Sequence, residues 1–143
     1  MTDKIVVLVT AGSAREATKI ASHLVESRLA ACVNISAPVR SLYRWQGKIK
    51  DDREFLLFIK TRKNRFREVK DAVLKIHSYT TPEIIALPVI EGSAAYLRWI
   101  DESVTKPALK RSANTPHPAR GVYPERSRRA RHPLPFGARE QIN

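Results

Sequence analysis

The chain of 143 residues has a single cysteine and no apolar run long enough to cross a membrane. Because Cys32 is alone, no internal disulfide can form, and a reducing cytoplasm is the default location. A membrane-spanning helix needs about 20 consecutive apolar residues, whereas the N-terminal segment offers only a short apolar run after Asp3. We therefore expect a core strand there and no signal peptide.

The 5 glycines do not form the phosphate-binding motifs GxGxxG or GxxxxGK[ST]. The turn Thr10–Ser13 (TAGS) precedes a helix start and is compatible with weak anion binding, but an ordinary strand-to-helix turn is the favoured interpretation. HExxH and paired Cys/His spacings are absent too, which argues against a preformed closed zinc site. Cys32 has no obvious base beside it and is interpreted as a buried, unreactive thiol.

The net charge of +12 is concentrated near the C-terminus. Residues 107–143 carry 8 Lys or Arg against 2 acidic residues, while residues 1–106 carry 18 against 12. The C-terminal segment also holds six of the nine prolines, and a segment without apolar periodicity cannot offset the entropy of ordering. We expect a folded domain over residues 1–106 and a basic, Pro/Arg-rich, disordered tail over residues 107–143. The tail is either an arm that contacts nucleic acid or acidic lipid, or an extension without function.

The first elements are predicted from two patterns. The β-branched run Lys4–Thr10 (KIVVLVT) lacks alternation, which is typical of a central strand buried on both faces. Ser13 and Glu16 have the spacing of a capping box, in which the Ser oxygen and the Glu side chain each bind a backbone N–H of the other residue. Apolar residues then recur at helical spacing, which predicts an amphipathic helix to about Arg28.

Extended segments follow the first helix. Ala30–Leu42 predicts a strand with a break at Ala37–Pro38, because proline donates no ladder hydrogen bond and suits a bulge or an edge position. Ser41–Thr61 predicts a long hairpin that reverses at Gln46–Gly47, where the glycine enters a left-handed turn without steric cost.

The remaining elements are a helix, a loop, a strand and a closing helix. Apolar spacing indicates a helix over Phe66–Ile76 with Asn64 as its N-cap. Tyr79–Glu83 (YTTPE) predicts a loop, since its proline disfavours helical geometry in the preceding residue. Ile84–Val89 predicts the fourth strand, and a third helix opens at Gly92–Ser93. The order β-α-β-β-α-β plus a C-terminal helix predicts an α+β, ferredoxin-like fold, with one antiparallel sheet and helices on one face.

The return arm of the hairpin is apolar on both faces. Phe55, Leu57 and Ile59 face one way, while Leu56 and Phe58 face the other, because side chains alternate along a strand. Both faces need cover. The helices of a small chain cover one face, so we expect the other to meet a second copy of the protein.

Candidate ligands are few. His77 ends the second predicted helix, where the helix dipole favours a cationic imidazole. A helix-terminating residue on the surface is the favoured interpretation, and a metal ligand is the alternative. The carboxylates of Asp51–Glu54 suit hard cations, although such a cluster is more often a solvated turn or a strand-edge bulge.

Aromatic and cationic side chains are interspersed along the hairpin and the loop, as in RNA-binding sheets. The return arm lacks the RNP1 pattern of such sheets, so we interpret these residues as interface anchors, for which Trp, Tyr and Arg are usual. They are Tyr43, Arg44, Trp45, Lys48, Lys60 and Tyr79.

Taken together, these segments resemble the CutA divalent-cation tolerance family. The matching runs are IVVLVTA, LVESRLAACVNI, SLYRWQGKI, LLFIKT, TPEIIALPV and YLRWI. They cover residues 4 to about 104 in the order and at the spacing of the family, and the tail has no counterpart. The resemblance implies a ferredoxin-like protomer in a tight homotrimer, in which the long hairpin reaches a neighbour and sheets meet around the threefold axis.

The resemblance also implies a cytoplasmic protein linked to tolerance of copper and other divalent ions. Some members bind metal, an animal branch is associated with acetylcholinesterase anchoring, and no reaction is implied. The metal ligands proposed for the family are a cysteine at the end of the first strand, here Val9, and histidines after the second helix. Only His77 remains of what can be a histidine pair, and it lies in His77-Ser78-Tyr79 where the family has His-Pro-Tyr.

Three hypotheses follow. The first is a non-enzymatic trimer in divalent-cation homeostasis, with His77 as the metal ligand. Its clefts between subunits would be lined by Tyr43, Trp45, Lys60, His77, Tyr79 and Glu83. The second is a module for a small anionic ligand, based on Lys60, Arg44 and the TAGS turn. The third is nucleic-acid contact through the tail; no membrane partner is expected.

Overall fold

The computed structural model describes residues 1–105, and the predicted tail over residues 107–143 lies outside the described residues. The elements are β1 (Lys4–Ala11), α1 (Ala14–Glu26), β2 (Cys32–Trp45), β3 (Lys48–Arg62), α2 (Phe66–Ile76), β4 (Ile84–Pro88) and α3 (Ala94–Val104), with a 3-10 turn at Lys63–Arg65. The predicted order of elements is confirmed.

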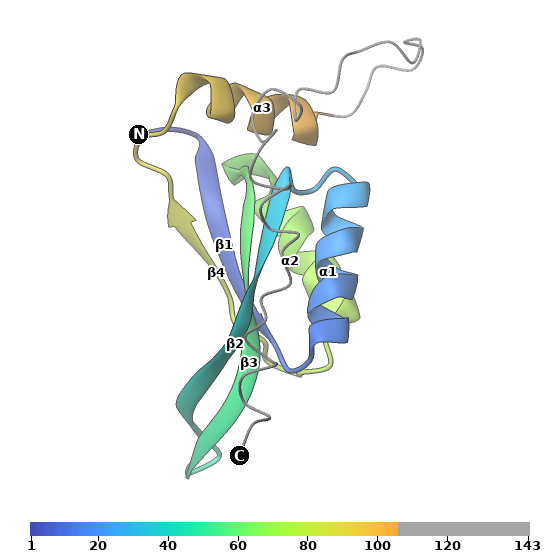
Figure 1. Ribbon diagram of the computed structural model, residues 1–143, viewed down its shortest axis with the longest axis vertical. Coiled ribbons are helices and arrows are strands. Elements are labelled where there is room, and N and C mark those ends of the chain that lie inside the picture. The colour runs from blue at the N-terminus through green and yellow to red at the C-terminus, as the bar shows by residue number, and fades with distance from the viewer. Residues whose placement is uncertain (106–143) are drawn as a thin grey trace, which may run out of the picture. The chain divides into compact units, whose positions relative to one another are not determined.

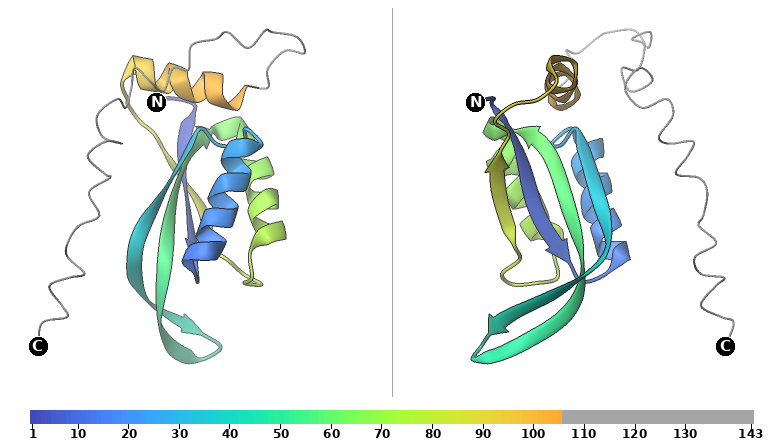
Figure 2. Two further views of the ribbon diagram at one scale, coloured as in Figure 1. Left: turned by 45° about the vertical axis from the view of Figure 1, so that its right-hand side comes forward. Right: turned by 60° about the vertical axis from the view of Figure 1, so that its left-hand side comes forward.

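The four strands form one antiparallel sheet in the order β2-β3-β1-β4. Helices α1 and α2 lie side by side on one face of the sheet, and α3 crosses one end of it (Figure 1; Figure 2). This is the predicted α+β, ferredoxin-like arrangement. The opposite face of the sheet carries no helix from the described part of the chain.

The core lies between the sheet and the helices α1 and α2. Alternation along β1 and β3 sends every second side chain to the helices, and each buried apolar side chain contributes roughly 1.5–3 kcal/mol. The fully buried set includes Val7, Val9, Leu57 and Ile59 from the strands and Ile20, Leu24, Val69 and Val73 from the helices.

A β-bulge shifts the pairing of β2 with β3 by one residue. Ile35 pairs with Leu57, but Pro38 pairs with Phe55, so β2 holds one extra residue between these two pairs. Because side chains alternate along a strand, the bulge reverses which residues of β2 face the helix-covered side. The predicted break at Ala37–Pro38 is confirmed.

Two local features fix the register of this hairpin. The Ser36 hydroxyl accepts a hydrogen bond from the Leu56 N–H at 2.9 Å, which gives that donor a partner where the ladder is interrupted. At the tip, Gln46 and Gly47 have φ angles of 49° and 76°. Two consecutive left-handed residues are what a tight hairpin turn requires.

The sheet face opposite the helices is apolar and uncovered in the protomer. Phe58 is 36% exposed, and Ile85 and Leu87 are each 48% exposed. The pairing registers place Val6, Leu8, Leu56, Phe58, Ile85 and Leu87 together on this open face. The return arm of the hairpin is therefore apolar on both faces, as predicted.

Beyond the sheet, β2 and β3 continue as a two-stranded arm (Figure 1). The pairing of β1 with β3 ends at Ala11 and Phe55, whereas the pairing of β2 with β3 continues to Trp45 and Lys48. An isolated two-stranded hairpin is only marginally stable in water.

The second predicted cap is wrong. Asn64 lies inside the 3-10 turn, and α2 begins after Arg65 without a capping hydrogen bond from a side chain. Within residues 1–105, none of the helices combines the length and the apolar character needed to span a membrane.

Candidate functional site

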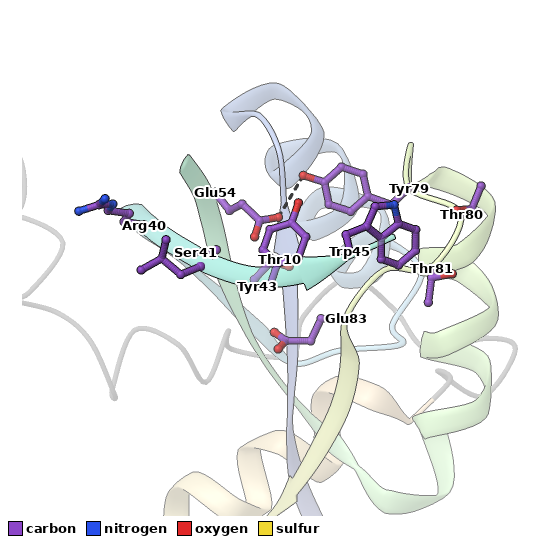
Figure 3. A pocket seen from close by; sticks show the side chains of 11 residues that line it. Thr10, Arg40, Ser41, Tyr43, Trp45, Glu54, Tyr79, Thr80, Thr81 and Glu83 are labelled. Carbon is purple, nitrogen blue, oxygen red and sulfur yellow. Dashed lines mark hydrogen bonds between the residues drawn. The ribbon is translucent and has the colours of Figure 1, made fainter. Parts of the chain in front are cut away.

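A pocket of about 650 Å³ lies between the arm and the loop that joins α2 to β4 (Figure 3). Its main walls come from two segments that are distant in the sequence. They are Tyr43, Trp45 and Glu54 from the hairpin and Tyr79, Thr81 and Glu83 from the loop.

The bulge in β2 brings the two hairpin aromatic residues to this pocket. Tyr43 pairs with Lys50, and it therefore shares the face of the hairpin that carries Glu54. Without the extra residue, Tyr43 would pair with Ile49 and point to the opposite face, and Trp45 would turn with it.

His77 anchors the loop to β1. Its side chain is 0% exposed. Nδ1 accepts a hydrogen bond from the Tyr79 N–H at 3.0 Å, so the ring proton lies on Nε2, which donates to the Thr10 carbonyl at 2.7 Å. The predicted surface position of His77 is wrong, because α2 ends against the sheet and its terminal side chain enters the interior.

Glu16 holds the same loop from α1. Its Oε1 accepts a hydrogen bond from the Ser78 N–H at 2.5 Å, and its Oε2 accepts from the Ser78 hydroxyl at 3.0 Å. The Ser13 hydroxyl accepts from the Glu16 N–H at 3.1 Å, as predicted, but the Glu16 carboxylate does not return the bond. The predicted capping box is therefore only half formed, since Ser78 offers the carboxylate two donors.

Tyr79 connects the loop to the hairpin across the pocket. Its hydroxyl donates to Oε2 of Glu54 at 3.0 Å (Figure 3). Burial, followed by this hydrogen bond, raises the pKa of Tyr79 to about 12. Gly12 leaves room for the ring, because a Cβ at that position would lie 2.9 Å from the Tyr79 hydroxyl oxygen.

Carboxylates give the pocket its electrostatic character. Glu83 reaches the pocket from the loop, and partial burial followed by the charge of Glu54 raises the pKa of Glu83 above its ordinary value. The Tyr43 hydroxyl donates to Asp52 at 2.5 Å, and this hydrogen bond is the main reason why the pKa of Tyr43 rises to about 12. Both tyrosines are therefore neutral donors at physiological pH.

Four of the six residues predicted to line a cleft meet in this pocket, namely Tyr43, Trp45, Tyr79 and Glu83. His77 lies behind it as an anchor. Lys60 does not line the pocket, and its Nζ lies 3.9 Å from the Cys32 sulfur farther along the sheet. Cys32 is only half-buried, and not buried as predicted, because β2 is an edge strand.

The residues that sequence reasoning misses are Glu54 and Glu16. Glu54 belongs to the cluster interpreted as a solvated turn, yet it is buried by the loop that packs over it. The alternation of β3 is the only sequence signal, because it places Glu54 on the face of Leu56 and Phe58. Among the residues that the structure describes, no three His, Cys, Asp or Glu side chains are grouped so that they could hold a metal ion.

Comparison with known proteins gives a consistent result. A family model for the CutA1 divalent ion tolerance protein matches residues 5–103. The divalent-cation tolerance protein CutA of Thermus thermophilus is 50% identical over 98 residues, which are 68% of this chain and 95% of the relative.

Solved structures agree. The periplasmic divalent cation tolerance protein CutA from Archaeoglobus fulgidus matches with a TM-score of 0.70 and 47% identity, over 71% of this chain and 99% of that chain. The structure of the Thermus thermophilus protein matches with a TM-score of 0.70 and 48% identity, over the same shares of the two chains.

Proposed function

Because the chain belongs to the CutA1 divalent ion tolerance protein family, we propose that it is a non-enzymatic protein of divalent-cation tolerance that works in the cytoplasm as a homotrimer. The family is named for a response to ions and not for a reaction. A single cysteine in 143 residues supports a reducing compartment, while the Archaeoglobus fulgidus relative is described as periplasmic.

The open face of the sheet is the observation that supports the assembly. Phe58, Ile85 and Leu87 leave an apolar surface in water, and the arm extends past the end of β1 as two strands only. Exposed contiguous apolar patches mark interaction sites. A neighbouring copy that covered the open face and the arm would remove the apolar surface from water and would stabilise the two-stranded arm. The resemblance to the family implies that this assembly has threefold symmetry.

Metal binding by one protomer is limited by the position of His77. Both ring nitrogens are hydrogen-bonded within the protomer, and Val9, at the place of the cysteine ligand that the resemblance implies, is fully buried in the core. These residues do not fit a tight copper site within one protomer. We therefore propose weak binding of copper or another divalent ion at clefts between subunits, where a neighbour completes the ligand set.

The small-anion hypothesis has less support. The charged side chains of the pocket are Glu54, Glu83 and Arg40, so carboxylates outnumber cations, and neither Lys60 nor Arg44 lines it. Nucleic-acid contact through residues 107–143 stays a prediction.

Calorimetric titration of Cu²⁺ and Zn²⁺ into wild type, His77→Gln and His23→Gln tests the metal proposal. His23 is exposed on α1, so His23→Gln is the matched control for the loss of one imidazole. We expect binding to weaken only in His77→Gln, because His77 holds the loop that carries Tyr79 and Glu83 to the proposed cleft. Circular dichroism verifies that each variant is folded. Micromolar or tighter binding that is unchanged in His77→Gln would remove His77 from the proposal.

A further inference from the structure

Glu54 is a buried carboxylate with an open acceptor. The residue is 5% exposed, and the Tyr79 hydroxyl donates its one hydrogen bond at 3.0 Å. Within residues 1–105, no Lys, Arg or His side chain forms an ion pair with it. An ionised carboxylate can accept about four hydrogen bonds. Oε1 of Glu54 accepts none from the described residues and is not fully buried, so a ligand in the pocket can reach it.

A second carboxylate shares the pocket, and nearby charges do not neutralise the pair. The negative charge of Glu54 disfavours ionisation of Glu83 and contributes, after burial, to the rise in the pKa of Glu83. Arg40 also lines the pocket, but its Nε and Nη2 bind the two Asp51 oxygens at 2.8 and 2.6 Å. The pocket thus attracts cations, although the chain as a whole carries a charge of +12.

Aromatic rings line the same space. Tyr43, Trp45 and Tyr79 line the pocket together with Glu54 (Figure 3). Rings attract a cation placed over their faces, and they also provide apolar surface for a carbon chain. A bare metal ion would leave this surface unused.

The volume of the pocket and the number of its metal-ligating side chains favour an organic cation over a metal ion. A volume of about 650 Å³ is that of a small-molecule site, and two carboxylates without a third acidic, histidine or cysteine ligand do not make a metal site in the described part of the chain. A primary ammonium group has three N–H donors, which match the open oxygens of Glu54 and Glu83.

We propose that the pocket binds a primary ammonium ion carried on a short aliphatic chain, with Glu54 and Glu83 accepting its N–H donors and the three aromatic rings enclosing its carbon chain. This ligand class goes beyond the proposed function, which concerns divalent metal ions, and the proposal does not depend on it.

Titration calorimetry of the full chain with n-butylammonium chloride tests the proposal. We expect saturable binding that weakens by at least about tenfold in Glu54→Gln and in Glu83→Gln, since each variant loses a hydrogen bond to a charged acceptor. Glu91→Gln removes an exposed carboxylate that does not line the pocket and is the matched control. Glu83 is exposed, so its variant tests the proposal even if Glu54→Gln unfolds.

Three further probes distinguish the chemistry. Tetramethylammonium has the charge without N–H donors, n-butanol has the chain without charge, and both should bind at least about tenfold more weakly than n-butylammonium. Magnesium chloride should compete no better than sodium chloride at equal ionic strength.

Several outcomes overturn the proposal. They are an absence of saturable binding, affinity unchanged in both pocket variants, equal affinity for tetramethylammonium, or specific competition by magnesium, which would indicate a metal site. Binding that appears only after dilution has dissociated an assembly would assign the pocket to a side chain of a neighbouring copy and would also overturn it.

Discussion

The position of the Tyr79 phenol depends on three neighbours from different elements. Glu54 accepts its hydrogen bond, His77 fixes its backbone N–H, and Gly12 leaves space for its hydroxyl. The phenol is kept neutral because burial and the Glu54 carboxylate both disfavour its ionised form.

This arrangement predicts a pH-dependent difference between wild type and Tyr79→Phe. The pKa of Tyr79 is raised from 10.0 to about 12 in the folded state, so its contribution to stability is complete below pH 10 and is lost as the pH rises from 10 towards 12. One pKa unit corresponds to about 1.4 kcal/mol. Because Tyr79 is 37% exposed, solvent screening reduces the expected contribution to about 1 kcal/mol. Urea unfolding at a series of pH values measures it.

Lys4 also titrates in this range, but it is present in both proteins and cancels in the comparison. Gly12→Ala should lower the pKa of Tyr79 without removing the phenol, because its new Cβ displaces the hydroxyl from Glu54. A difference in unfolding free energy between wild type and Tyr79→Phe that stays constant up to about pH 12 would contradict this account of Tyr79.

The position of a residue can be predicted from the sequence where it depends on the residue's own element, and not where it depends on a partner far along the chain. The sequence predicts that Tyr43, Trp45, Tyr79 and Glu83 line a cleft between subunits, and in the protomer they line one pocket. The interior position of His77 is not visible in the sequence, because its partner is the Thr10 carbonyl, 67 residues away.

At the scale of elements, periodicity locates the helices and strands, whereas their ends depend on contacts from elsewhere. The Glu16 carboxylate accepts a hydrogen bond from the Ser78 N–H and not from the N–H of its own helix cap. The segment around Asn64 forms a 3-10 turn and not a capped helix start. The bulge at Ala37–Pro38 follows from the chemistry of proline. Its consequence for Tyr43 and Trp45 depends on which residues of β3 lie opposite, and only the folded sheet shows that.

The bulge predicts a local effect for Ser36→Ala. Loss of the hydroxyl leaves the Leu56 N–H without its partner, which should lower the free energy of unfolding by about 1–2 kcal/mol. Hydrogen exchange at the Leu56 amide should become faster than in wild type. Ser22→Ala, at an exposed position of α1, is the control and should be neutral or slightly stabilising. Unchanged exchange at Leu56 would show that another acceptor replaces Ser36.

At the scale of the whole molecule, the open face predicts that the proposed trimer depends on a few apolar side chains. Phe58→Lys places a charge at the centre of this face and should lower the mass measured by sedimentation from that of a trimer to that of a monomer. Leu74→Lys is the matched control, since Leu74 is 46% exposed on α2, away from the open face. A wild-type chain that is monomeric at high dilution and free of aggregation would argue against the trimer.

Because of the extra residue between Ile35 and Pro38, the position of Tyr43 and Trp45 in the pocket depends on the length of β2 as well as on its amino-acid composition. Deleting Ala37 would keep every residue of the pocket in the sequence. It would, however, move the side chains of Tyr43 and Trp45 to the opposite face of the hairpin. A homologue with the same aromatic residues but a β2 strand one residue shorter would therefore lack the aromatic lining of the pocket. Insertions and deletions before the arm are thus more informative about ligand binding in such homologues than substitutions within it.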